Sequence, residues 1–153
     1  ELSLDYHFTR NIHFGVNGEY IFAQNLQSGY PLPFIPPASV VAVFEYEFES
    51  VLPKFMDGTY VSLTSRTSVA QNRVARNEPA TDGFSLVHLA LGTDFLLGKQ
   101  KLNLRFAVNN LLDAKYFAHL NQYRRLNLPE PGRNFQLTLT VPITTKLKKQ
   151  DEQ

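Results

Sequence analysis

Asn134-Phe135-Gln136-Leu137-Thr138-Leu139-Thr140-Val141 alternates polar and apolar side chains without a break, and the pattern extends to Ile143. Successive side chains of a β-strand point to opposite faces of a sheet, so this period of two predicts a strand with one polar and one apolar face. The same alternation recurs at residues 1–8, 12–22, 39–49, 59–70, 87–95 and 101–109. The sequence therefore predicts an all-β fold of about seven strands.

The connections between these stretches alternate in length. Short connections are expected at 9–11, 51–58 and 97–100, and long ones at 23–38, 71–83 and 111–132. In an antiparallel sheet, this order puts the short turns on one rim and the long loops on the other, as in outer-membrane β-barrels. Strands of about 9 to 11 residues also cross a bilayer at a tilt. The pattern thus favours a segment of an antiparallel transmembrane β-barrel.

Composition excludes several other classes. The 153 residues are 43% hydrophobic and 19% charged, which is too apolar for a disordered chain. No apolar run approaches the roughly 20 residues of a membrane helix. A net charge of +1 argues against a nucleic-acid partner. The absence of Cys and the scattered His residues predict neither a metal site nor a cofactor. Because Glu1 is not an initiator Met and no signal peptide follows it, we expect a mature product or a fragment.

A soluble fold remains an alternative at this point. A free-standing soluble antiparallel β-barrel that binds a small apolar ligand shows the same alternation, with its apolar face turned inward. Periodicity does not say which way the faces point. The asymmetry of the connections favours the membrane interpretation.

Two motifs in the last third of the chain resemble a known family. Asn109-Asn110-Leu111-Leu112-Asp113-Ala114-Lys115-Tyr116 resembles the Asn-Leu-Phe-Asp-x-x-Tyr signature of TonB-dependent outer-membrane receptors, with Leu112 where Phe is commoner. Pro129-Glu130-Pro131-Gly132-Arg133-Asn134-Phe135 is similar to the Pro-Gly-Arg element that opens their last strand. Segments 32–37, 70–73 and 83–87 lie where the family has similar elements.

This resemblance implies a specific architecture and role. Residues 1–143 would form the last seven or so strands of a plugged barrel of about 22 strands. Residues 144–153 would form a polar tail where the family usually ends on an aromatic residue. The whole receptor would lie in the bacterial outer membrane and import a scarce nutrient, such as a ferric siderophore or other iron chelate. It would contact outer-membrane lipid and, through upstream regions, the TonB energy-coupling protein.

The long loops carry the candidate ligand-binding residues. They combine guanidinium and aromatic groups, which hold anionic chelates through charge-assisted hydrogen bonds and stacking. The candidates are Arg73, Arg76, Tyr123, Arg124 and Arg125. Asp113 is also placed to cap a short helix that begins the last of these loops.

No catalytic residues are predicted, and the chain is not expected to be an enzyme. Glu45, Glu47 and Glu49 share one strand face at spacings of about 7 Å, a separation that inverting glycosidases use. A strand facing a wet barrel interior also carries such charges. Arg105 also falls on the polar side of its strand, and it is expected to pair with Asp94 on the neighbouring strand.

Overall fold

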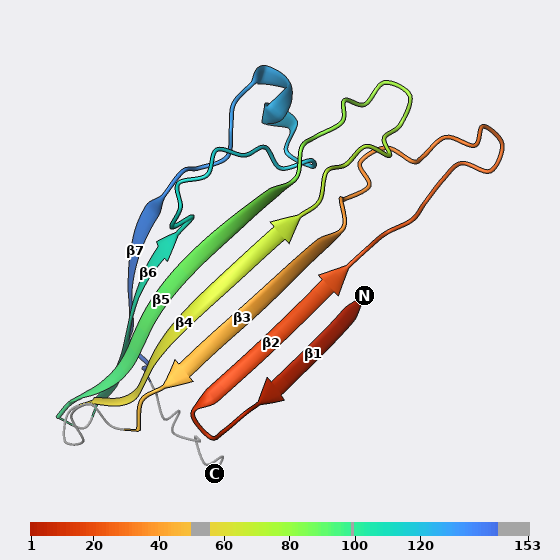
Figure 1. Cartoon of the computed structure of the whole chain (residues 1–153). Coiled ribbons are helices and arrows are strands. Elements are labelled where there is room, and N and C mark those ends of the chain that lie inside the picture. Colours follow the sequence, from red (N-terminus) through yellow and green to blue (C-terminus); the bar gives the residue numbers. More distant parts are fainter. Residues whose placement is uncertain (50–55, 99, 144–153) are drawn as a thin grey trace, which may run out of the picture.

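The chain forms one antiparallel sheet of seven strands in sequence order (Figure 1). A computed structural model describes residues 1–49, 56–98 and 100–143. The elements are β1 (Leu2–His7), β2 (Ile12–Glu19), β3 (Ser39–Glu47), β4 (Met56–Ser68), β5 (Phe84–Leu97), β6 (Gln100–Asn109), a 3-10 helix η1 (Gln122–Leu126) and β7 (Asn134–Thr140). The predicted all-β antiparallel fold is confirmed. The predicted polar tail, 144–153, and most of the predicted turn at 51–58 lie outside the described residues.

The long connections gather at one end of the sheet. Figure 1 shows those between β2 and β3, β4 and β5, and β6 and β7 together, while the turn between β1 and β2 lies at the opposite end. We call them the first loop (20–38), the second loop (69–83) and the third loop (110–133). This arrangement confirms the expected asymmetry of the two rims.

The observed ends of the strands differ from the predicted ones because they depend on where the partner strand begins or ends. The alternation predicts that the second strand continues to Phe22, but β2 ends at Glu19, whose partner is Ser39. Pro36 and Pro37 precede β3 and lack backbone N–H groups, so the ladder does not extend further in that direction. β5 begins earlier than predicted because Phe84 still pairs with Ser68.

The register gathers the apolar side chains on one face of the sheet. One row runs from strand to strand through Tyr46, Val61, Leu91, Phe106 and Leu137. The adjacent row, on the other face, runs through His13, Glu45, Ser62, Ala90, Ala107 and Gln136. We call these the apolar face and the polar face. The predicted division of each strand into an apolar side and a polar side is confirmed.

The two faces differ in what covers them. Large side chains of the apolar face are exposed over the width of the sheet, with Leu4 57%, Leu91 47% and Leu137 71% accessible. At the loop end of the polar face, by contrast, Pro36 of the first loop and His119 of the third loop line a small cavity together with strand residues. The loops therefore fold over the polar face.

One predicted ion pair is wrong. Asp94 faces Asn103, from which its carboxylate accepts a hydrogen bond of 2.8 Å, and it pairs with Lys101 at 2.9 Å. The register places Arg105 opposite Gly92. The alternation of the sequence predicted the correct face of the sheet for Arg105 and Asp94, but it did not predict which residues are neighbours across the two strands.

None of the described helices is long and apolar enough to cross a membrane.

Candidate functional site

The carboxylate of Glu78 joins the first and second loops. It is buried and accepts the backbone N–H of Phe34 at 3.2 and 3.3 Å from its two oxygens. It also accepts the N–H of Ala75, in its own loop, at 3.2 Å. A carboxylate that receives backbone donors from two loops fixes both of them relative to each other.

The third loop reaches the same carboxylate through two basic side chains. His119 Nε2 lies 3.1 Å from Glu78 Oε1, which is an ion-pair distance, but the two atoms lack hydrogen-bond geometry. Arg124 Nη2 lies 3.7 Å from the same oxygen. His119 Nδ1 shares a hydrogen bond of 2.6 Å with the Thr81 hydroxyl. Arg124 also donates to the carbonyl of Pro79 at 2.9 Å. All three loops therefore meet at Glu78, and we call Glu78, Thr81, His119 and Arg124 the loop cluster.

Burial favours the neutral form of the His119 imidazole. Its pKa is lowered mainly by burial and further by the charge of Arg124, while Glu78 opposes the shift. Glu19 and Arg66 of the polar face line the small cavity beside the ring. Protonation of His119 would add a positive charge to a cluster in which Glu78 and Arg124 already balance.

We expect the loop cluster to weaken as the pH falls. A His whose pKa is lower in the folded state binds protons more readily when unfolded. The stability of the cluster is therefore complete above about pH 6.5, and it is lost as the pH falls from there through the lower pKa of the folded state. Hydrogen exchange of the Phe34 and Ala75 amides, corrected for intrinsic rates, should show less protection at about pH 5.5 than at about pH 7.5. The variant His119→Gln should flatten this dependence. Equal or greater protection at the lower pH would contradict the assignment.

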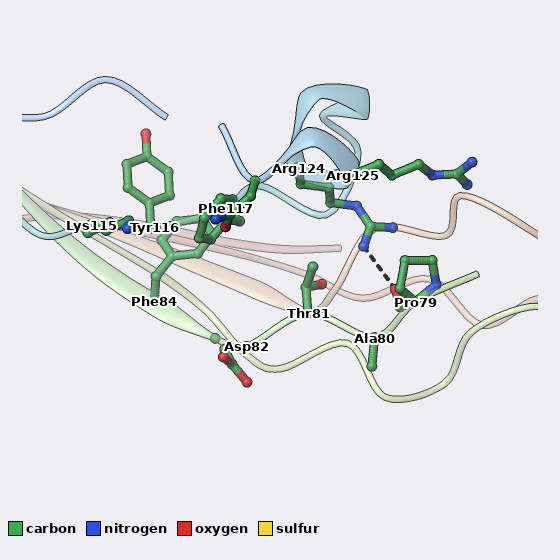
Figure 2. A pocket seen from close by; sticks show the side chains of 12 residues that line it. Pro79, Ala80, Thr81, Asp82, Phe84, Lys115, Tyr116, Phe117, Arg124 and Arg125 are labelled. Atoms are coloured by element: carbon green, nitrogen blue, oxygen red, sulfur yellow. Dashed lines mark hydrogen bonds between the residues drawn. The ribbon is translucent and has the colours of Figure 1, made fainter. Parts of the chain in front are cut away.

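A cavity of about 780 Å³ opens between the second and third loops, beside the loop cluster (Figure 2). Phe84 and Tyr116 form its aromatic wall, with ring centroids 4.5 Å apart. Burial, and to a lesser extent Glu130, raises the pKa of Tyr116, so its phenol stays protonated at neutral pH. Lys115 and Arg125 are exposed at the cavity. The lining therefore offers ring surfaces for stacking and exposed cations for an anionic group, and it also includes the exposed carboxylate of Asp82.

The predicted ligand-binding residues take different places. Arg124 and Arg125 line the cavity, but the guanidinium of Arg124 is largely engaged by Glu78 and Pro79. Arg76 and Tyr123 are exposed and are not among the lining residues. Arg73 packs on the ring of Phe22, 3.7 Å from its centroid, and donates to the first loop at Ala23 and Gln24. Arg73 thus joins two loops.

The helix of the third loop starts later than predicted. Asp113 does not cap it, because its φ of 55° is left-handed and its carboxylate accepts the N–H of Arg133 at 2.8 Å. The helix η1 is capped instead by Asn121, which accepts the N–H of Tyr123 at 2.9 Å. The predicted helix start at Asp113 is therefore wrong.

The two sequence motifs form one structural unit. The buried side chain of Asn110 donates to the carbonyls of Ala114 and Pro131 at 2.9 and 3.4 Å and accepts from the N–H of Ala114. Gly132 lies against Asp113, where a Cβ would come within 2.8 Å of the carboxylate oxygen. The first motif, at the start of the third loop, thus binds the second motif, which forms the end of the same loop.

Residues 1–49, 56–98 and 100–143 contain no group of three or more His, Asp or Glu side chains arranged to hold a metal ion.

Comparison with known proteins gives one kind of match. No family model matches the chain, and no curated protein matches it. Among solved structures, the chain is similar to the copper transporter OprC, with a TM-score of 0.73 and 24% sequence identity. The match covers 90% of this chain and 22% of that one, so this chain spans about a fifth of its length. The likeness concerns the fold alone, which is that of a segment of an outer-membrane β-barrel.

Proposed function

We propose that the chain is the C-terminal part of the barrel of a TonB-dependent outer-membrane receptor that imports a small nutrient. The observation that carries this proposal is the apolar face, which is exposed from β1 to β7. An apolar surface that continues across a whole sheet is far larger than the patches found on water-soluble monomers. In the hydrocarbon layer of a bilayer, the exposure of such an apolar surface carries no free-energy penalty.

Aromatic side chains at both ends of the apolar face support a bilayer position. Tyr6 packs edge-on against Phe8, and Tyr46 against Phe48, at the end with the short turns. The exposed Tyr20 lies at the loop end. Barrels of outer membranes carry such girdles at the two membrane interfaces.

The open sheet argues against the soluble alternative. β1 and β7 are its two edges among the described strands, so these seven strands by themselves do not enclose an apolar ligand. The loops also fold over the polar face. A transport role, and not a catalytic one, is therefore the proposal.

For the cargo, we propose an anionic chelate of a scarce metal, with an iron chelate as the first candidate. The cavity beside the loop cluster lies among the long loops, which face outward in outer-membrane barrels. Its aromatic wall and two exposed cations suit a ring-bearing anion. The TonB protein would energise release through upstream parts of the receptor.

Removing both exposed cations of the cavity should weaken uptake of anionic chelates. In the intact receptor, Lys115→Ala combined with Arg125→Ala should cost about ten- to a hundredfold in affinity for each charge-assisted hydrogen bond lost. Arg124 is left in place because Glu78 holds it. Uptake of labelled ferric chelates, anionic and neutral, provides the measurement, and Arg76→Ala is the control. Equal uptake by the double variant and the control would remove this cavity from ligand recognition.

A further inference from the structure

A groove of about 380 Å³ runs across the apolar face at the loop end of β1 to β4. Gly18 forms its floor, with Leu2 opposite it on β1 and Val40 opposite it on β3. Thr67, opposite Val40 on β4, continues the row, and Tyr20 and Val69 complete the walls. The groove exists because the one residue of β2 in this row has no side chain.

The glycine is not required by the backbone. Gly18 has an ordinary strand conformation, and a Cβ built on it would meet nothing nearer than the Ser39 carbonyl oxygen and Val40 Cγ2, each at 3.9 Å. No close approach or turn therefore explains it. What Gly18 provides is open space between exposed apolar side chains, since Val40 and Val69, away from the edge of the sheet, are 48% and 53% accessible.

We propose that this groove binds one acyl chain of an outer-leaflet lipid. The inference rests on the proposed function, because the groove is continuous with the face assigned to the bilayer. Its walls are mostly apolar, and an acyl chain that fills the open space gains close van der Waals contact with them. No Lys or Arg is among its lining residues, so the structure assigns an acyl chain and not an anionic headgroup.

The position of the groove fits a lipid acyl chain that enters from the membrane–water interface at the loop end of the sheet. It lies where the strands enter the long loops, and the exposed Tyr20 stands at its loop end. Tyr side chains favour the interface, where the ring meets acyl chains and the hydroxyl meets water. A lipid chain that enters beside Tyr20 would pass over Gly18.

Photo-crosslinking in a bilayer tests this site. The intact receptor would be reconstituted in vesicles of phosphatidylethanolamine and phosphatidylglycerol with a trace of phosphatidylethanolamine that carries a diazirine in its acyl chain. We expect adducts at Tyr20 and Val40 to exceed those at Phe106 and Leu137, on the same face, several-fold. Gly18→Leu should abolish this excess. Ala42→Leu, which places the same side chain on the apolar face outside the groove, should leave it unchanged.

The outcomes separate this inference from the proposed function. Uniform labelling of the apolar face, or an excess that survives filling of the groove, would overturn the acyl-chain site. If Gly18→Leu does not assemble, Val40→Phe fills the groove from β3, and the adducts at Tyr20 give the answer. An absence of labelling over the whole apolar face would instead contradict the membrane position of the sheet.

Discussion

Glu78→Ala is expected to release the three long loops from one another. The substitution leaves the side chains of His119 and Arg124 buried beside no anion and removes the acceptor of the Phe34 and Ala75 amides. Removing one partner of a buried ion pair costs about 3 to 5 kcal/mol. We expect this loss in the free energy of local opening of the loops, measured by hydrogen exchange of their amides.

Two further variants make this prediction specific. Glu78→Gln keeps an acceptor for the amides but leaves Arg124 without its anion, so its effect should be intermediate. Asp82→Ala removes an exposed carboxylate from the same loop and should change the opening free energy by less than about 0.5 kcal/mol. If Glu78→Ala behaves like Asp82→Ala, then Glu78 does not join the loops.

Leu91→Arg is expected to destabilise the barrel by about 2 to 4 kcal/mol in a bilayer. Leu91 lies in the middle of β5 on the apolar face, so the guanidinium would enter the hydrocarbon layer. On a face that met water, the same change at a side chain already 47% exposed would be nearly neutral. Reversible unfolding of the intact receptor in vesicles measures the difference.

Gln136→Arg is the matched control for this substitution. Gln136 is exposed on the polar face of β7, in the row next to Leu137, so an added cation there stays in the wet interior. It should change the free energy of unfolding by less than about 0.5 kcal/mol. Equal costs for Leu91→Arg and Gln136→Arg would argue against a lipid-facing apolar side.

The strands were predictable because one simple periodicity decides them. A period of two identifies a strand and both of its faces together, and the row through Leu91, Phe106 and Leu137 confirms the faces. Strand ends were less predictable, because they depend on the partner. Phe22 keeps the alternation of β2, but Pro36 and Pro37 offer no N–H to continue the ladder.

The loops could not be predicted in the same way. A loop has no period, so nothing in the sequence distinguishes the buried Glu78 from the exposed Asp82 only a few residues later. Its burial depends on donors more than 40 positions away in the sequence, such as the amide of Phe34. For the same reason Arg73 and Arg124, which the sequence predicts as ligand-binding residues, prove to join loops to one another.

Cysteine accessibility tests most directly whether the apolar face meets lipid. The chain has no Cys of its own, so single substitutions report on single positions. Phe44→Cys and Leu137→Cys lie on the apolar face, and Glu45→Cys and Gln136→Cys are their neighbours on the polar face. In the intact receptor in vesicles, we expect the first pair to react with a lipid-soluble maleimide and resist a charged one. The second pair should react with the charged reagent. If Phe44→Cys and Leu137→Cys instead react with the charged reagent, or resist both, the apolar face meets water or protein, and the transporter account is contradicted.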